Sequence, residues 1–145
     1  MATRSRIGIE KEDGTILSVY CHWDGYPSHN GRILLESYTD KEKVSDLIKL
    51  GSISILAKNL TPTLETAGKH HFDNPAKDVV VAYHRDRGEA LVSRADGSIN
   101  SFAKSDFEEY GYIFTKEGQW KIVYGDAQVE DLTQKICDGG EYFLE

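Results

Sequence analysis

The sequence lacks several features that would assign it to a familiar class. No apolar run approaches the roughly 18 residues that a membrane-spanning helix needs, and no signal-peptide pattern opens the chain. The only two cysteines, Cys21 and Cys137, lie far apart and outside any CxxC pair, which argues against a zinc knuckle or a redox motif. We therefore expect a cytoplasmic protein without a membrane segment, in which Cys21 is a small buried thiol.

The common catalytic motifs are also missing. The chain contains no GxSxG, HExxH, P-loop or GxGxxG pattern. Cys21 and His22 are neighbours, but adjacent strand residues point to opposite faces, so they cannot form a nucleophile–base pair. The histidines and carboxylates around His70 and His71 show no fixed metal-ligand spacing. The sequence thus predicts no catalytic residue, no metal site, no cofactor and no enzymatic activity.

Positive charge is scarce overall but locally concentrated. The net charge of −7 argues against binding to a long nucleic acid, which depends on Lys and Arg neutralising phosphates. Acidic residues dominate from Asp106 to Glu145, whereas basic residues gather in "TRSR" near the start and in "HRDRGEALVSR" at 84–94. Local arginines in an acidic chain suit a small anionic ligand. A solvated acidic face explains the C-terminal region equally well.

The hydrophobic patterns predict a single α+β domain over residues 1–145. Strands at 4–9 and 15–23 are joined by a turn at Asp13-Gly14, a strong hairpin signal. Further strands are expected at Val79–Asp86, 110–115 and 120–126, and residues 52–60 fit either a short helix or a strand. The sum is an antiparallel sheet of about five strands, with two to four helices packed on one face or end.

Helices are predicted in three places. Residues 28–39 read as helical with Ser28 as a possible N-cap. A second helix is better signalled, because Thr39 and Glu42 have capping-box spacing and Gly51 stands where the helix should end. The last helix is expected over about Val129–Cys137, before Gly139-Gly140 and a short closing "EYFL". The long segment at 61–78 is loop-like, and such a loop tends to be functional or mobile.

The stretch "YCHWDGYP", residues 20–27, holds the best candidate site. Strand alternation places Tyr20 and His22 on one face, where Arg4 and Arg6 of the preceding strand can lie beside them. Arginines bind phosphates, aromatic rings stack on bases, and a carboxylate accepts from ribose hydroxyls. The candidate ligand-binding residues are Arg4, Arg6, Tyr20, His22, Trp23, Asp24, Tyr26, His84, Arg85 and Arg87.

A purely structural interpretation of the same residues stays open. In it "WDGYP" is a turn in which Asp24 caps the loop, Gly25 supplies a positive φ, and Tyr26 packs over the turn. Cys21 and Trp23 then belong to the core. The "HRDRGE" stretch becomes a solvated strand end with local ion pairs.

The opening "MATRSRIGIE", the Asp-Gly hairpin and "YCHWDGYP" before a helix resemble a group of small phage and prophage proteins, the Thoeris anti-defence sponge family. The resemblance covers about the first 35 residues well and "YHRDRGE" loosely. It implies an α+β protomer that assembles into dimers or larger oligomers, with pockets where protomers meet. It also implies binding of cyclic ADP-ribose-type immune signals without cleavage. The matching positions are Arg4, Tyr20, His22, Trp23, Asp24 and Tyr26.

Three functions therefore remain in play. The leading expectation is a phage-type protein of the host-cell cytoplasm that sequesters a cyclic ADP-ribose-like or cyclic nucleotide signal and acts as a homo-oligomer. An alternative is an acidic protein–protein inhibitor of a host defence protein, acting as a nucleic-acid mimic. A third is a hydrolase or lyase on nucleotides, with His22 or His84 as the acid–base group.

Overall fold

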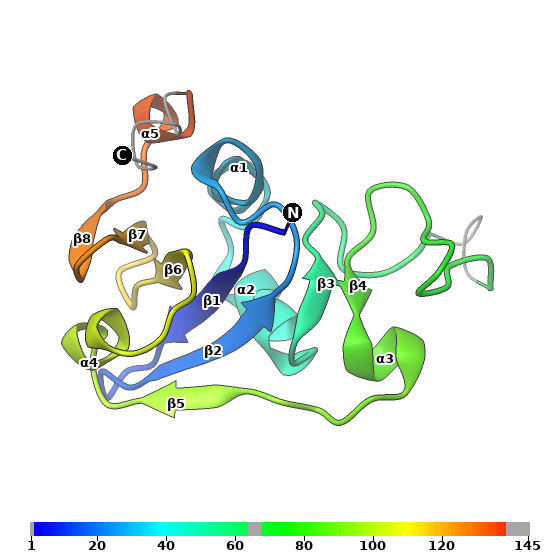
Figure 1. Ribbon diagram of the computed structural model, residues 1–145, viewed down its shortest axis with the longest axis horizontal. Helices are drawn as coiled ribbons and strands as arrows, with labels where there is room; N and C mark the ends of the chain where they lie inside the picture. Colours follow the sequence, from blue (N-terminus) through cyan, green and yellow to red (C-terminus); the bar gives the residue numbers. More distant parts are fainter. Residues whose placement is uncertain (1, 64–67, 139–145) are drawn as a thin grey trace.

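A mixed β-sheet runs through the part of the chain that the computed structural model describes, residues 2–63 and 68–138. Eight strands are found in these residues, and seven of them follow the sheet order β4-β3-β2-β1-β6-β7-β8 (Figure 1). The eighth, β5, pairs with the start of β2, whereas β3 pairs with the end of β2. The strands are β1 (Ser5–Glu10), β2 (Ile16–Cys21), β3 (Ile53–Ile55), β4 (Val81–Ala82), β5 (Arg94–Asp96), β6 (Tyr110–Phe114), β7 (Trp120–Tyr124) and β8 (Gln128–Asp131).

The α+β class is confirmed, but the sheet is larger than expected and is not purely antiparallel. β1 pairs with β6 in parallel, and β2 meets β3 in parallel at Cys21 and Ile53. The remaining pairs, including β1–β2 and β6–β7, are antiparallel. Side-chain alternation predicts that a segment is a strand, yet it does not say which strand will lie beside it. The parallel pairs join segments that are distant in the sequence.

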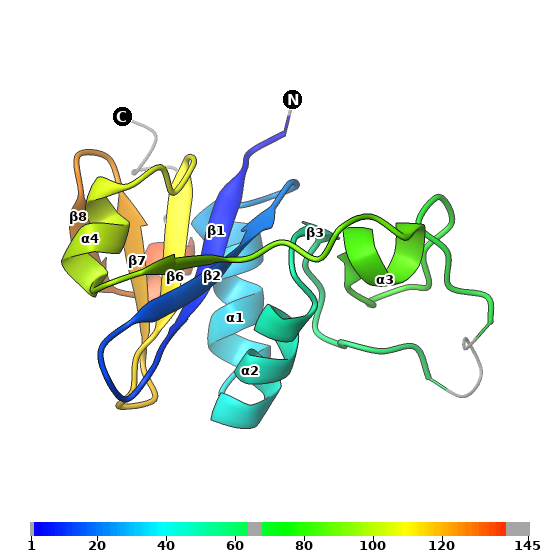
Figure 2. The same ribbon diagram turned by 90° about the horizontal axis from the view of Figure 1, so that it is seen from below.

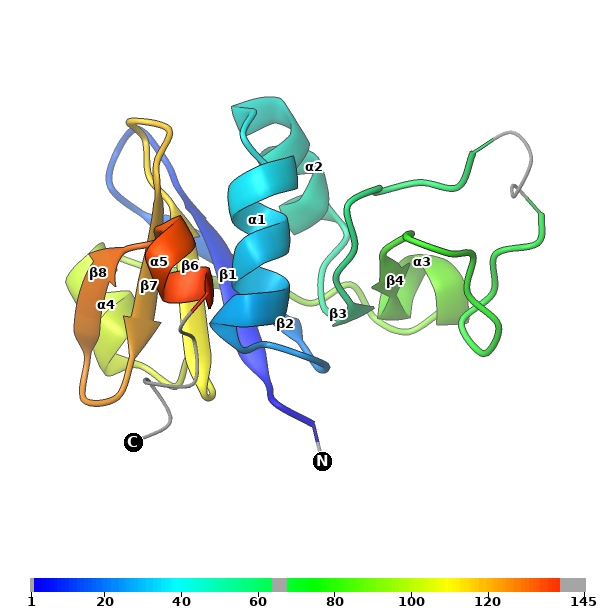
Figure 3. The same cartoon turned by 90° about the horizontal axis from the view of Figure 1, so that it is seen from above.

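Helices cover both faces of the sheet. They are the π-helical turn η1 (Pro27–Gly31), α1 (Arg32–Ser37), α2 (Lys41–Lys49), α3 (Tyr83–Arg87), α4 (Ile99–Lys104) and α5 (Gln134–Asp138). α1, α2 and α5 lie on one face (Figure 3), whereas α4 lies on the opposite face (Figure 2). The expectation of helices on one face or end is therefore incomplete. Among the described residues, no helix is long and apolar enough to cross a membrane.

The first hairpin forms as predicted. Gly14 adopts a φ of 88°, and the Asp13 carboxylate accepts a hydrogen bond from the Thr15 backbone N–H at 2.9 Å. Val19 and Cys21 are fully buried on the face that α1, α2 and α5 cover, whereas Ile16 is fully buried on the face that α4 covers. Period-two alternation along β2 thus divides its side chains between two hydrophobic cores.

The core beneath α1, α2 and α5 is the larger of the two. It contains residues from β1, β2, β6 and β7 together with α1 and α2, among them Ile7, Leu34, Leu47, Tyr112 and Ile122. The smaller core lies under α4 and holds Ile16, Phe102, Ala103, Phe107, Ile113 and Val123. Four of the five aromatic rings of the β6–β7 hairpin, those of Tyr110, Tyr112, Phe114 and Trp120, are nearly or fully buried, and Tyr124 is partly buried.

Several predicted boundaries are wrong. Residues 79–86 form only the short β4 and then α3, and residues 129–137 hold the end of β8 before α5. α2 begins after Asp40, whose side chain accepts from the Glu42 N–H, so the N-cap lies one residue beyond Thr39; Gly51, with a φ of 75°, ends the helix as expected. Ser28 lies inside η1. Gly139, Gly140 and "EYFL" lie outside the described residues.

Candidate functional site

The backbone after β2 is fixed by hydrogen bonds to two other segments. The His22 N–H donates to the Ile53 carbonyl at 3.1 Å, and the Trp23 N–H donates to the Ser54 carbonyl at 3.0 Å. The Gly25 N–H donates to the Thr3 carbonyl at 2.8 Å. The main chain of "HWDG" is therefore held in place without help from its own side chains.

A buried asparagine and a buried tyrosine complete this corner. Asn30, which is fully buried, donates from Nδ2 toward the Trp23 carbonyl and the Cys21 sulfur, both at 3.3 Å. The Tyr112 hydroxyl donates to the Gly25 carbonyl at 2.6 Å. Burial raises the pKa of the Cys21 thiol to about 11, so it stays protonated and inert at neutral pH. This agrees with the expectation of a small buried thiol.

The turn itself differs from the structural interpretation in one respect. Asp24, and not Gly25, has the positive φ, at 58°. Gly25 is required for another reason, because a Cβ there would lie 2.7 Å from the Ser5 Cβ and 2.9 Å from the Thr3 carbonyl oxygen. The Asp24 carboxylate accepts a hydrogen bond from the Tyr26 hydroxyl at 3.4 Å. Asp24 and Tyr26 thus bond to each other within the turn.

Three aromatic side chains project from this fixed backbone. The Tyr20 hydroxyl lies 2.6 Å from His22 Nδ1, and the His22 and Trp23 rings meet edge to face with their centroids 4.8 Å apart. Trp23 is 41% exposed, so the expectation that it belongs to the core is wrong. Trp23 lies two residues beyond Cys21, the last residue of β2. The result is a continuous row of aromatic rings at the surface.

The two arginines of the N-terminal segment differ in accessibility. Arg6 pairs with Tyr20 in the β1–β2 register, and its guanidinium donates from Nε to the Ser18 hydroxyl at 3.0 Å. It is only 9% exposed, and burial together with the charge of Arg94 lowers its pKa. The Arg4 side chain is 49% exposed and lies 3.6 Å from the Glu108 carboxylate. Of these two, Arg4 is the one that an external ligand can reach.

Sequence reasoning missed the acidic partners of these arginines. Glu108 adopts a φ of 73°, a conformation that an L-residue takes at a cost, and its side chain is 18% exposed. Arg94, in β5, pairs with Asp96 at 3.1 Å and donates to the Asp106 carbonyl at 2.8 Å. Arg94 belongs to the basic cluster seen in the sequence, but no pattern indicates that β5 brings it beside β2.

The α3 segment adds a second aromatic–arginine group. The Arg87 guanidinium lies over the Phe72 ring at 4.2 Å and near the Tyr83 ring at 5.2 Å from the centroids. Burial raises the pKa of Tyr20, and the nearby acidic groups of Glu108 and Tyr83 raise it further. The His22 N–H bonds to the Ile53 carbonyl, and Ile53 pairs with Ala82, the residue before α3. β3 alone therefore separates the hairpin end from the start of α3 in the sheet order.

The other two candidates in α3 serve the fold. The Arg85 guanidinium donates to the carbonyls of Leu60 and Val80, both at 2.6 Å, and pairs with Asp86. His84 Nδ1 bonds to the Glu89 carbonyl at 2.7 Å. Arg85 thus makes several internal contacts, and its role in ligand binding stays a prediction. The internal contacts form because α3 replaces the expected strand and turns Arg85 toward the preceding loop.

We define the aromatic–arginine surface as the side chains of Arg4, Tyr20, His22, Trp23, Tyr83 and Arg87. Four of the six were predicted on the first hairpin, and Arg87 was predicted from its local sequence. Among the described residues, no group of three or more His, Cys, Asp or Glu side chains is placed to hold a metal ion. Comparisons with protein-family models, curated proteins and solved structures find no match for this chain. The structure thus defines an α+β protein with an aromatic and cationic surface at one end of its first hairpin.

Proposed function

We propose that the protein binds and sequesters a cyclic ADP-ribose-like or cyclic nucleotide signal at the aromatic–arginine surface, without cleaving it, as a phage-type anti-defence protein of the cytoplasm. The observation that carries the proposal is the exposed ring of Trp23 on a rigid backbone, in a row with His22 and Tyr20. A base gains stacking energy on such rings whatever its identity. A preformed row loses little conformational entropy on binding.

The charges around this row fit the rest of a nucleotide. The Arg4 guanidinium is half exposed and has donors left over after its single contact with Glu108. Arg87, which is also half exposed, lies at the α3 end of the surface. Guanidinium groups recognise phosphates through paired N–H donors, and the Glu108 carboxylate is an acceptor for ribose hydroxyls. Exposed aromatic rings together with exposed guanidinium groups therefore match the base and the phosphates of a nucleotide.

A homo-oligomer would make this surface a better trap. The six side chains lie along the outside of one protomer, where a bound ligand keeps one side in water. Retention without chemistry requires slow release, and slow release follows from burying more of the ligand. We propose that a second copy covers the ligand, which predicts that ligand binding and self-association strengthen each other.

The test is a thermal-shift titration with cyclic ADP-ribose isomers and cyclic oligonucleotides, followed by mass spectrometry of the heat-released ligand. We expect a rise in Tm and recovery of the intact ligand. Trp23→Ala and Arg4→Met should each abolish most of the shift. The control Arg32→Met removes an arginine of α1 that pairs with Asp138 of α5, and this variant should retain the shift. The proposal is wrong if none of these nucleotides shifts Tm at concentrations well above micromolar.

The same experiment separates the two other functions. Recovery of a cleaved product in place of the intact ligand would identify an enzyme. Tyr20 and His22, which are hydrogen-bonded to each other, would then be the acid–base candidates to mutate. An acidic inhibitor is favoured by β8, the last strand of the described sheet, which presents Glu130 and Asp131 at its exposed edge. A pull-down from host lysate that retains a stoichiometric basic protein and no small molecule would favour that alternative.

A further inference from the structure

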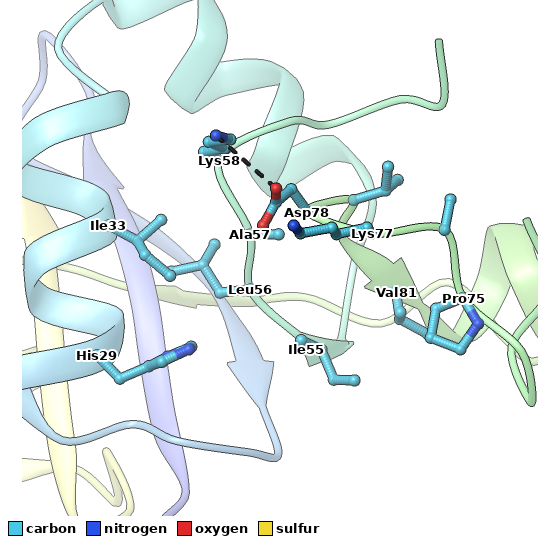
Figure 4. A pocket seen from close by; sticks show the side chains of 12 residues that line it. His29, Ile33, Ile55, Leu56, Ala57, Lys58, Pro75, Lys77, Asp78 and Val81 are labelled. Carbon is cyan, nitrogen blue, oxygen red and sulfur yellow. Dashed lines mark ion pairs between the residues drawn. The ribbon is translucent and has the colours of Figure 1, made fainter. Parts of the chain in front are cut away.

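A pocket lies beside η1 and α1, and its lining is separate from the aromatic–arginine surface. One wall is η1 and α1, and the other is the segment that leads into β4 (Figure 4). Its floor is the chain that follows β3. The pocket has a volume of about 360 Å³, which is within the usual range for small-molecule sites. None of the residues of the aromatic–arginine surface lines it.

The interior of the pocket is apolar. Leu56, Val79 and Val81 are almost fully buried, and Ile33 and Ile55 are partly exposed toward the space between the walls. In Figure 4 the Leu56 side chain lies beside Ile33, and Val81 lies on the opposite side of the pocket. These aliphatic groups offer an apolar body the contacts that water does not provide.

Charged groups stand at the mouth of the pocket. Lys58 Nζ lies 3.8 Å from the Asp78 carboxylate, and the Lys77 side chain extends toward the same region (Figure 4). The mouth therefore holds two lysines and one aspartate, which leaves a local excess of positive charge in a chain whose net charge is −7. An anion near Lys77 is attracted by this excess.

The His29 ring lines the pocket and offers it a hydrogen-bond acceptor. His29 Nδ1 is 2.9 Å from the Asn30 Oδ1, while Asn30 Nδ2 donates to other groups. The Asn30 oxygen must therefore accept, so His29 Nδ1 carries the hydrogen and neutral His29 keeps Nε2 as an acceptor. This acceptor suits an N–H or O–H group on the bound molecule.

The outer wall is anchored, so the pocket exists before a ligand arrives. The Ala76 N–H donates to His70 Nδ1 at 3.0 Å, and His70 Nε2 lies 3.2 Å from the Asp86 carboxylate. The backbone of Asn59 also bonds to this wall: its N–H donates to the Asp78 carbonyl, and its carbonyl accepts from the Val80 N–H. Preorganisation of this kind lowers the entropic cost of binding.

From these observations we infer that the pocket binds a small amphipathic anion. An aromatic or aliphatic body lies against Ile33, Ile55 and Leu56, and a single sulfonate, carboxylate or phosphate group lies at Lys77. This site is separate from the aromatic–arginine surface, and its ligand is of a different class, since it needs one apolar body and one charge.

The test uses two dyes with the same aromatic body. The anion 8-anilinonaphthalene-1-sulfonate is compared with the neutral N-phenyl-1-naphthylamine in fluorescence titrations of the full chain. Lys77→Met should weaken binding of the sulfonate by about fivefold and leave the neutral dye unchanged. Asp78→Asn should strengthen binding of the sulfonate only. Asparagine tolerates the φ of 60° at this position, so the wall should keep its shape.

Two further variants complete the test. Ile55→Ser should weaken both dyes alike, because it changes the apolar part of the pocket. Lys104→Met, on α4 at the opposite face of the sheet, removes the same charge from the chain and should change neither dye. The inference is overturned if Lys104→Met and Lys77→Met act equally, or if both dyes bind as before to Ile55→Ser. Neither result depends on nucleotide binding, so the proposed function is tested separately.

Discussion

Two segments of this protein look alike in sequence, but the fold uses their side chains in opposite ways. Residues 22–26 and residues 83–87 each combine a histidine with at least one further aromatic ring and at least one charged side chain. In the first segment, backbone groups make the structural bonds, and the Trp23 ring remains exposed. In the second, the side chains of Arg85 and Asp86 make those bonds.

The difference shows what determines whether a polar cluster is open to a ligand. After β2, the neighbouring strand β3 supplies carbonyls for the His22 and Trp23 N–H groups. Around α3, the preceding loop has few strand neighbours, and Arg85 satisfies its carbonyls instead. Buried backbone groups need partners in either case. Side chains are free to bind a ligand where the main chain already supplies those partners.

The strongest test of this comparison removes the Asp86 carboxylate. Its side chain is 6% exposed and accepts from the Ala82 N–H at 2.8 Å, with Arg85 and His70 as further partners. Asp86→Ala leaves those groups unpaired, so we expect a loss of about 3 kcal/mol in the free energy of unfolding, measured by urea denaturation. The control Asp46→Ala, at a half-exposed ion pair on α2, should cost no more than about 0.5 kcal/mol. Equal losses in the two variants would contradict the structural role of Asp86.

A smaller effect is expected from a change to the backbone of the first segment. In Gly25→Ala the new methyl group meets Ser5 and the Thr3 carbonyl, so the two chains must separate. We expect a loss of about 2 kcal/mol in the free energy of unfolding by the same measurement. Gly97→Ala is the matched control, because its Cβ would meet nothing within 4 Å. If both variants are equally stable, the close approach at Gly25 is not required.

The pH dependence of stability gives a third test of the α3 segment. Burial opposes ionisation of Asp86, but hydrogen bonds from Arg85, Ala82 and His70 outweigh it and hold the pKa of this carboxyl below its ordinary value of 3.8. A depressed pKa in the folded state means that the stabilisation is present above about pH 4 and is lost as the pH falls through the folded-state pKa. We therefore expect the stability gap between the wild type and Asp86→Asn to be constant near neutral pH and to shrink in acid. Urea midpoints measured from pH 7 down to pH 3 check this, and a gap that widens in acid would have the wrong sign.

The sequence predicts local structure well where the signal is itself local. Asp13-Gly14 specifies the first hairpin, and Gly51 marks the end of α2, because a positive φ is a property of one residue and its neighbours. The parallel pairing of β1 with β6 could not be predicted, since it depends on contacts between residues about 105 positions apart. The same limit applied to Glu108, which reaches Arg4 only through this pairing.

The candidate site follows the same division. Alternation along β2 correctly placed Tyr20 and His22 on one face, with Arg6 beside Tyr20. It failed at Trp23, because the strand ends at Cys21 and the left-handed conformation of Asp24 follows. The strand expected at 79–86 was also wrong, because the short helix α3 begins at Tyr83 and ends the period-two alternation there.

The smallest expected effect on stability is at Trp23, the most exposed ring of the first segment. Because its ring is 41% exposed and its backbone N–H bond survives truncation, Trp23→Ala should lower the free energy of unfolding by only about 0.5 kcal/mol. Trp120→Ala, at the other tryptophan, is the control. That ring is 4% exposed and its Nε1–H donates to the Tyr38 carbonyl at 2.8 Å, so its removal should cost several times more. A large loss of stability in Trp23→Ala would show that the ring serves the fold, and it would remove the main support for the proposed ligand surface.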